Sequence, residues 1–291
     1  MSSSYTAVYV MMPEQHNANH DRASAKLMAI VNLTPDSFYA ASRSFSCEEV
    51  ERRVERAISE GADILDFGGY STRPGAEEVP MEEEWRRVRM GLAALRRCGG
   101  EGVTLSIDSF RAEVVRRAYE EFGPFIVNDI SAGELDEGMI ATVARYGLSY
   151  VAMHMRSTPQ DMQQHTEYRR GVVEEVVAYF ERRVEELVAR GVAREAIVVD
   201  PGFGFSKLVE QNWELMAAIP RLAERYRVLV GVSRKSMLYK PLGLTAEDVL
   251  PATLAVGWEA LRSGAEILRV HDVAATRQII DLYNYAKNVE R

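Results

Sequence analysis

The chain has 291 residues, a formal net charge of −8 at pH 7 and a sequence pI of about 5.4. This negative balance disfavours proteins that bind nucleic-acid backbones or anionic membranes, so we expect neither partner. No apolar stretch reaches the roughly 18 residues of a membrane span, and the N-terminus does not show the basic-then-apolar pattern of a secretion signal, so we expect an intracellular protein. The two cysteines, Cys47 and Cys98, suggest no disulfide framework or thiolate metal site, which favours a reducing cytoplasm.

Short apolar runs alternate with helical patterns along most of the chain. Residues 1–26 show no helical period and predict a flexible N-terminal arm, whereas residues 27–291 predict a single domain. The apolar runs that predict strands are, in chain order, LMAIV (27–31), ADILDFGG (62–69), VTLSID (103–108), FIVND (125–129), SYVAMH (149–154), AIVVDPG (196–202), RVLVGVS (227–233) and EILRVH (266–271).

Helical periods fill the segments between several of these runs. The first covers Glu48–Glu60 and is followed by Gly61, a plausible cap. The clearest amphipathic helix lies between the fifth and sixth runs, and another is expected from about Ala246 to Ser263. The apolar faces of the predicted helices include Val50 and Val54; Trp85, Val88 and Leu92; Val114, Val115 and Ala118; Val173, Val176, Val177, Phe180, Val184, Leu187 and Val188; and Ile279, Ile280 and Tyr283.

Eight alternating strand and helix units predict a TIM (β/α)₈ barrel of the α/β class. The strands are apolar throughout rather than alternating, as expected when both faces of a parallel sheet are buried. A doubly wound open sheet is the alternative, but no G-x-G-x-x-G motif follows the first run. Each run ends near a polar residue, and in a barrel these ends converge on the catalytic mouth: Asn32, Asp66, Asp108, Asn128, His154, Asp200, Ser233 and His271.

The strand-end side chains suggest two kinds of ligand chemistry. Each of the carboxylates Asp66, Asp108 and Asp200 is as well explained as a cap, but three around one mouth favour an N–H-rich heterocycle. Lys235 and Arg269, with His271, favour an anion site at the end of the seventh and eighth strands. The hydroxyls of Ser233 and Ser236 flank the lysine and could add donors.

Loops and aromatic residues near the strand ends leave alternatives open. The segments NLTPDSF and GGYSTRPG read either as ordinary turns or as binding loops, in which Arg73 pairs with Asp36 over the reaction. In DPGFGFSK the aromatic rings favour barrel packing, although the loop can also lie against a flat ring. His154 reads equally well as a buried, satisfied imidazole, and no zinc spacing is present.

Seven segments together resemble the dihydropteroate synthase family, from about Met28 to the last helix. They are NLTPDSF, GGYSTRPGA, SIDS, VNDIS, DPGFGFSK, VGVSRKS and RVHDV. The resemblance implies a folate-pathway transferase that joins 6-hydroxymethyl-7,8-dihydropterin diphosphate to p-aminobenzoate and releases pyrophosphate. It also implies a Mg²⁺ cofactor, sulfonamide-type inhibitors and a homodimer formed through helices remote from the mouth.

The resemblance also implies roles for individual residues. Those implied in catalysis are Asp108, Lys235, Arg269, His271, Asp36 and Arg73. Those implied around the pterin are Asp108, Asn128, Ile130, Met153, Asp200, Phe205, Gly231 and Lys235. Those implied around p-aminobenzoate are Thr72, Arg73, Phe205, Ser233 and Ser236, with Lys235 at its border. The diphosphate is implied to contact Asn32, Thr72, Arg269 and His271, with Asn32 also ligating Mg²⁺.

The chain departs from the family pattern at three places. Tyr70 replaces a common Glu, Ser206 replaces a common Gly, and YAASRSF replaces a Gly-containing stretch after TPDSF. None of these changes removes an implied catalytic residue, but they bear on loop closure. The alternatives are a pterin-binding methyltransferase acting on methyltetrahydrofolate, which would not need STRPG or the anion site, and a non-catalytic pterin-binding paralogue.

Overall fold

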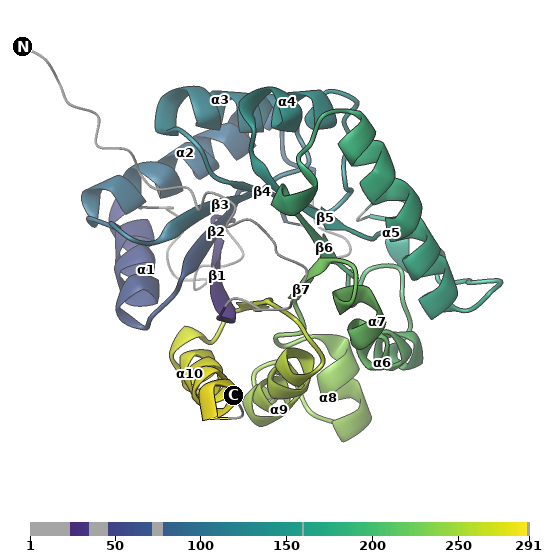
Figure 1. Ribbon diagram of the computed structural model, residues 1–291. Coiled ribbons are helices and arrows are strands. Elements are labelled where there is room, and N and C mark those ends of the chain that lie inside the picture. Colours follow the sequence, from purple (N-terminus) through teal and green to yellow (C-terminus); the bar gives the residue numbers. More distant parts are fainter. Residues whose placement is uncertain (1–23, 35–45, 72–77, 159, 290–291) are drawn as a thin grey trace, which may run out of the picture.

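The computed structural model describes residues 24–34, 46–71, 78–158 and 160–289. Its eight strands pair in parallel, each with the next in sequence, and β8 pairs with β1, so the sheet closes into a barrel. Helices form a ring around the strands (Figure 1). The predicted barrel is therefore confirmed, while the predicted N-terminal arm lies almost entirely outside the described residues. The strands are β1 (Lys26–Asn32), β2 (Ile64–Gly68), β3 (Thr104–Asp108), β4 (Ile126–Asp129), β5 (Ser149–Met153), β6 (Ile197–Asp200), β7 (Arg227–Val230) and β8 (Ile267–Val270).

The helices follow the strands in the expected alternation, with some extra elements. The structure adds α4, α6, α7 and α8 to the helices expected from the sequence, and the helix expected from about Ala246 begins at Leu250. The helical elements are α1 (Cys47–Ser59), α2 (Met81–Arg97), α3 (Ala112–Phe122), α4 (Met139–Tyr146), η2 (Met162–Gln164), α5 (Val172–Ala189), η3 (Arg194–Ala196), α6 (Val209–Ala217), α7 (Ile219–Ala223), α8 (Ser236–Leu242), α9 (Leu250–Arg262) and α10 (Val273–Val289).

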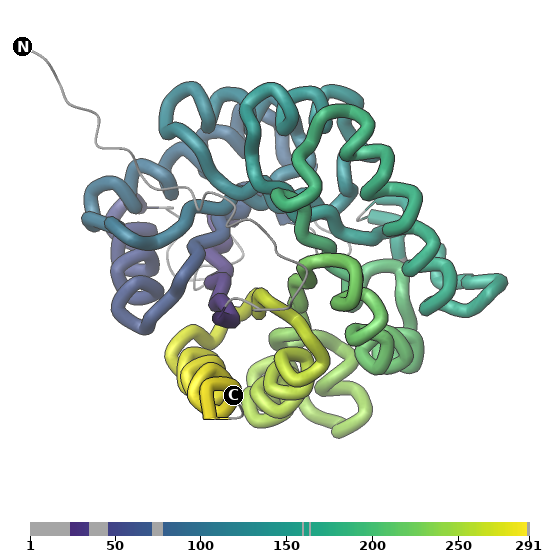
Figure 2. Tube along the Cα trace, viewed as in Figure 1, coloured from purple at the N-terminus to yellow at the C-terminus, as the bar shows by residue number. Residues whose placement is uncertain are grey.

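The two ends of the described chain meet where the barrel closes. Figure 2 shows the last helix, α10, beside the first strand, β1, and Asn284 Oδ1 accepts a hydrogen bond of 3.1 Å from the backbone N–H of Ala25. No helix among the described residues has both the length and the apolar character required to cross a membrane.

The barrel interior is built in layers because alternate residues of each strand face inward. Its floor is an apolar cluster formed by Met28, Ile64, Ile126, Val151, Val198, Leu229 and Ile267. Two residues further along the strands, four of the seven inward positions are polar, namely Asp66, Asn128, Asp200 and Arg269, and the other three are Ile30, Met153 and Gly231. The sequence thus places a closed hydrophobic floor directly beneath a polar mouth.

Candidate active site

Asp66 lies at the centre of the polar layer. Its carboxylate is fully buried and accepts hydrogen bonds from Ser106 Oγ at 2.6 Å and Asn128 Nδ2 at 2.9 Å. Arg269 Nε donates to the same carboxylate at 2.7 Å. Asp66 was grouped with the other strand-end carboxylates in the sequence but had no assigned role. The structure shows that it orients both Asn128 and Arg269.

Arg269 bridges two of the three strand-end carboxylates. Its Nη2 donates to Asp108 Oδ2 at 2.7 Å while its Nε contacts Asp66. The sequence placed this arginine in an anion half of the mouth, separate from the carboxylates. In the structure its charge is already matched by two carboxylates, because a parallel barrel brings β8 round to β1 and so close to β2 and β3.

Burial and shared charge shift the pKa of Asp108. The pKa of this carboxyl is raised to about 7: desolvation by burial is the largest cause, Arg269 acts in the opposite direction, and the charge of Asp66 adds to the rise. A second carboxylate beside the same guanidinium makes the ionised form of Asp108 less favourable than it would be in an isolated pair. Burial lowers the pKa of the Arg269 guanidinium, but Asp66 and Asp108 outweigh that effect and raise it.

Lys235 lies across the mouth beside the loop that follows β6. Its ammonium donates to the carbonyl of Phe203 and lies 4.9 Å from the centroid of the Phe205 ring. Burial lowers the pKa of Lys235 to about 8, and Asp200 acts in the opposite direction. Burial also raises the pKa of Asp200, whose Oδ1 accepts from the Gly202 N–H at 2.8 Å.

The β6 loop is held in place by a buried lysine that had no assigned role. Lys207 Nζ donates to the carbonyls of Gly202 at 3.0 Å and Phe205 at 2.9 Å. It also lies 3.0 Å from His154 Nδ1. Burial drives the pKa of Lys207 well below its usual value, with Asp200 opposing the shift. The signal in the sequence was the lysine that closes DPGFGFSK.

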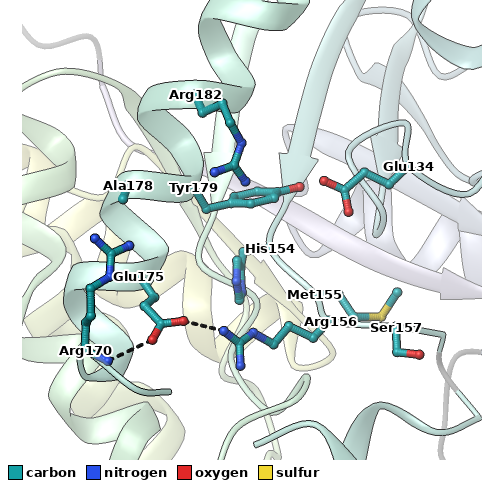
Figure 3. A pocket seen from close by; sticks show the side chains of 10 residues that line it. All are labelled: Glu134, His154, Met155, Arg156, Ser157, Arg170, Glu175, Ala178, Tyr179 and Arg182. Atoms are coloured by element: carbon teal, nitrogen blue, oxygen red, sulfur yellow. Dashed lines mark hydrogen bonds and ion pairs between the residues drawn. The ribbon is translucent and has the colours of Figure 1, made fainter. Parts of the chain in front are cut away.

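His154 does not join the mouth, so the expectation that all eight strand-end polar residues converge there is wrong. Its ring packs against α5, with the Tyr179 ring edge-on at 4.9 Å between centroids. It forms one wall of an outer pocket of about 370 Å³ between the β5 loop and α5 (Figure 3). Met153 faces inward, so the next residue faces outward. The other interpretation, a buried and satisfied imidazole, is confirmed, since His154 is 3% exposed and contacts Lys207.

An apolar wall lines another part of the mouth. This wall contains Ile130 and Met153, two residues implied around the pterin, and they pack with Met155 and Met162, which had no predicted role. The half-buried Phe205 ring packs against this cluster. A flat heterocycle has two apolar faces that such side chains can cover. The wall thus gives ring faces a contact, while the polar layer gives ring edges their partners.

Some of the remaining predicted residues lie at the mouth, and the others fall in segments that the structure does not describe. Ser233 Oγ is 3.1 Å from His271 Nδ1, which brings these two together. Gly231 lies beside Arg269 and Lys235, and Gly68 leaves space between Asp108 Oδ2 and Asn32 Oδ1. Ser236 is the first residue of α8. The predicted roles of Asp36, Thr72 and Arg73, and their closing pair, fall on residues that the structure does not describe.

Tyr70 marks where the chain leaves β2 towards residues 72–77. Its hydroxyl accepts a hydrogen bond of 2.9 Å from Gln160 Nε2, on the β5 loop. Its ring meets the Phe110 ring edge-on at 5.2 Å between centroids, and the Arg111 guanidinium lies 5.3 Å from its centroid. The ring contacts with Phe110 and Arg111 explain how a tyrosine is accommodated at a position where the family resemblance leads us to expect Glu.

The metal-binding side chains available in the mouth suit a cation that is bound partly by the protein and partly by the phosphate oxygens of a substrate. Among the described residues, no group of three or more His, Cys, Asp or Glu side chains is placed to hold a metal ion. Mg²⁺ often binds through one or two protein oxygens together with phosphate oxygens and water. The amide oxygen of Asn32 fits such a role, because it shares the space over Gly68 with the Asp108 carboxylate.

Comparison with known proteins gives a consistent family. Residues 28–271 match the model of the pterin binding enzyme family. The chain is 41% identical to a dihydropteroate synthase of Neisseria meningitidis over 86% of this chain and 89% of the relative. The solved structure of the Burkholderia cenocepacia dihydropteroate synthase complexed with 7,8-dihydropteroate is 39% identical, with a TM-score of 0.80 over 92% of this chain and 93% of that one. A sulfonamide drug complex of the Yersinia pestis enzyme is 32% identical, with a TM-score of 0.84 over 91% and 95% of the two chains.

Proposed function

Because this chain belongs to the pterin-binding enzymes, as a dihydropteroate synthase of folate biosynthesis, we propose specific roles for its described mouth residues. The observation that carries the proposal is the bridge from Arg269 to Asp66 and Asp108, which fixes two carboxylates above the apolar floor. The substrates are 6-hydroxymethyl-7,8-dihydropterin diphosphate and p-aminobenzoate, and the products are 7,8-dihydropteroate and pyrophosphate.

The pterin is recognised by its edges and its faces. Asp200 and Asn128 meet the amino and ring N–H groups, since a carboxylate accepts and an amide can do both. Met153 and Phe205 cover the ring faces. Lys235 reaches the same ring from the β7 end, and its contact with the Phe205 face sets its position.

The reaction is a substitution at the pterin methylene carbon. The bond from that carbon to the diphosphate oxygen breaks and both electrons leave with pyrophosphate. The amine of p-aminobenzoate then supplies the electron pair of the new carbon–nitrogen bond and loses a proton. Asp108 lies in a buried site where a fixed negative charge stabilises the cation that develops between these steps.

The p-aminobenzoate side of the mouth is formed by the ends of β6 and β7. Phe205 offers a ring face, and Ser233 and Ser236 offer hydroxyl donors near Lys235. Sulfonamides are proposed to compete at this place, in keeping with the drug complex of the Yersinia pestis enzyme. The parts of this subsite on residues 72–77 lie outside the described chain.

A magnesium ion is proposed for the diphosphate end of the site, held by Asn32 together with substrate oxygens. When bound, Mg²⁺ supplies positive charge to oxygens that become more negative as the leaving group departs. His271 is positioned there by two contacts with Ser233. The backbone N–H of His271 donates to Ser233 Oγ at 3.2 Å, and the ring Nδ1 lies 3.1 Å from the same oxygen.

The assignment of roles is tested by assaying dihydropteroate and pyrophosphate with and without Mg²⁺, using Lys235→Ala. The matched control is Lys240→Ala, which removes an exposed lysine of α8. Product that depends on Mg²⁺, falls strongly in Lys235→Ala and is unchanged in Lys240→Ala supports the roles. Pterin binding without product would instead favour the methyltransferase or the non-catalytic paralogue.

A homodimer is proposed through α6, α8 and the residues that flank them. Four large apolar side chains are exposed there: Leu208, Trp213, Leu242 and Leu244. Trp213 Nε1 donates to the carbonyl of Met237 at 3.1 Å, which joins the two helices into one surface. Exposed apolar groups gathered on neighbouring elements are typical of an interface.

The oligomeric state can be tested by light scattering on Leu242→Glu, which places a charge on this surface. The control is Leu282→Glu, on a separate exposed apolar set of α10 that includes Tyr285 and Val289. Loss of the dimer in the first variant alone supports the proposal. Loss only in the α10 variant would move the interface to α10.

A cytoplasmic setting is proposed as well, because Cys47 and Cys98 are both free thiols.

A further inference from the structure

The loop that follows β6 determines where Lys235 lies in the mouth. The Lys235 ammonium donates to the backbone carbonyl of Phe203 and lies 4.9 Å from the centroid of the Phe205 ring. Its aliphatic stem passes beside Gly204, because a Cβ built on that glycine would lie 3.4 Å from Lys235 Cδ. Three consecutive residues of one loop therefore contact this side chain along its length.

Lys207 holds the same loop from its own end. Its Nζ donates to the carbonyls of Gly202 at 3.0 Å and Phe205 at 2.9 Å, which lie on either side of the carbonyl that Lys235 uses. It also donates to the carbonyl of His154 at 3.3 Å and lies 3.0 Å from the imidazole Nδ1 of that residue, so it joins the loop to the end of β5. The carbonyls of the loop are thus divided between two buried lysines.

Two backbone N–H groups fix the rest of the path. The N–H of Gly204 donates at 2.7 Å to Oδ1 of Asn212, a buried residue of α6. The N–H of Phe205 donates at 3.1 Å to the carbonyl of Gly202, which closes a turn. Each peptide unit is planar, so a carbonyl turns only together with the N–H that follows it. The Phe203 carbonyl shares its peptide unit with the Gly204 N–H and is therefore directed at the mouth.

The charged groups around the two lysines show why Lys207 is suited to hold a backbone. Burial lowers the pKa of Lys207 well below its usual value; Asp200 opposes this shift, whereas Lys235 and Arg156 add to it. Around Lys235 itself, Asp200 opposes the effect of burial and Arg269 adds to it. Among the residues that the structure describes, Lys207 forms no ion pair, so its donors serve carbonyls and an imidazole.

We propose that Lys207 is a positioning residue for the synthase reaction. By holding the carbonyls on either side of Phe203, it fixes the acceptor of the Lys235 ammonium and the ring of Phe205. It acts through the loop and not by contact with a substrate. The proposal rests on the proposed roles of Lys235 and Phe205 in binding the pterin and p-aminobenzoate.

The test compares Lys207→Met with Lys207→Gln. Both replacements are uncharged and similar in length, but only glutamine can donate hydrogen bonds to the carbonyls. A difference between them therefore reports the hydrogen bonds and not the loss of a charge. The matched control is Arg183→Met, which removes another buried cation that donates to a carbonyl, that of Ala132.

Two properties are measured in each variant: kcat/KM, and the pKa of Lys235 by NMR titration of protein labelled with ¹³C-lysine. We expect Lys207→Met to lower kcat/KM about tenfold or more. The pKa of Lys235 should be lower in Lys207→Met than in Lys207→Gln by about half a unit or more, because the ammonium loses a fixed acceptor. Arg183→Met should leave the pKa of Lys235 unchanged. The titration is simple to assign because the sequence has lysines only at positions 26, 207, 235, 240 and 287.

The same pKa of Lys235 in Lys207→Met and Lys207→Gln, with kcat/KM no lower in Lys207→Met than in Arg183→Met, would overturn the inference. Thermal unfolding shows which variants are folded. If Lys207→Met does not fold, Asn212→Leu decides, because it frees the Gly204 N–H without changing a charge. The pKa of Lys235 should fall in that variant too, and an unchanged value would overturn the inference. A wild-type chain that forms no dihydropteroate would overturn the proposed synthase roles, whereas the NMR titration would still test whether Lys207 positions Lys235.

Discussion

The Nη2 of Arg269 lies 2.7 Å from Oδ2 of Asp108, so a side chain of the last strand, β8, contacts a carboxylate of the third strand, β3. This contact does not make Asp108 a strong acid. Burial is the largest cause that raises its pKa to about 7, and Asp66, which shares the same cation, adds to the rise, whereas the guanidinium opposes it. The protonation of Asp108 therefore changes within the physiological range of pH.

The first prediction concerns the acidic limb of the pH–rate profile. Stabilisation of a cation needs the ionised form of Asp108, so kcat/KM should rise with pH through about 7. In Asp66→Asn the second carboxylate is gone and Arg269 serves Asp108 alone, so the limb should move to lower pH. Steady-state kinetics from pH 5 to 9 measure both. If the midpoint of this limb is the same in Asp66→Asn as in the wild type, Asp66 does not influence the pKa of Asp108 through Arg269.

Stability should fall over the same pH range. The pKa of Asp108 is raised on folding, so between about pH 4 and pH 7 the folded protein binds its proton more tightly than the unfolded chain does. This group alone lowers the free energy of unfolding by about 2 to 3 kcal/mol between pH 5 and pH 8. Urea unfolding at both pH values should show a smaller fall in Asp108→Asn than in the wild type. Identical falls in the two proteins would contradict the raised pKa.

The alkaline limb is assigned to Lys235. Burial lowers its pKa to about 8, so its charge is lost as pH rises through that value and kcat/KM should fall. An arginine stays charged, so Lys235→Arg should lack this limb up to pH 9 while having a lower maximum rate, about tenfold or more. The control Lys240→Arg, on the exposed part of α8, should keep the wild-type profile. A limb near pH 8 that persists in Lys235→Arg would assign it to another group.

Strand ends were predictable from the sequence because apolar runs and their polar ends follow the geometry of a parallel barrel. That reasoning brought Asp108, Asn128, Asp200 and Arg269 to one mouth. It misplaced His154, because in a strand with Met153 facing inward the next side chain faces outward. Counting residue parity along each run would have separated the two.

Pairing within the mouth could not be predicted in the same way. The contact between Arg269 and Asp66 joins residues 203 positions apart, and it depends on the register with which β8 closes on β1. Lys207 was also missed, since its role depends on the path of the β6 loop. Helix α8 has seven residues and contains Pro241, so its period was too short to recognise.

Two glycines of the β6 loop offer a matched test of that path. Both have positive φ, +69° at Gly202 and +81° at Gly204, so alanine is strained at either. A Cβ at Gly202 would lie 2.1 Å from the carbonyl oxygen of His154, whereas at Gly204 it would lie 3.4 Å from a flexible Lys235 carbon. Gly202→Ala should therefore destabilise the chain by about 2 kcal/mol more than Gly204→Ala in urea unfolding. Equal losses would mean that the backbone of His154 yields easily.

The family resemblance leads us to expect glycine at Ser206, and the backbone conformation there is one that favours glycine. Its φ is +54°, a left-handed conformation that costs a side chain about 1 kcal/mol. The serine offsets that cost, because its Oγ donates to the carbonyl of Arg156 at 2.9 Å and accepts from the Arg156 N–H at 3.0 Å. Ser206→Gly loses both hydrogen bonds but also the strain, so its unfolding free energy should stay within about 1 kcal/mol of the wild type. Ser206→Ala loses the bonds and keeps the strain, so it should be destabilised by about 1 to 3 kcal/mol. Urea unfolding of Ser206→Gly and Ser206→Ala measures this difference. If the alanine variant is as stable as the glycine variant, the two hydrogen bonds between Ser206 and Arg156 do not hold the β5 and β6 loops together.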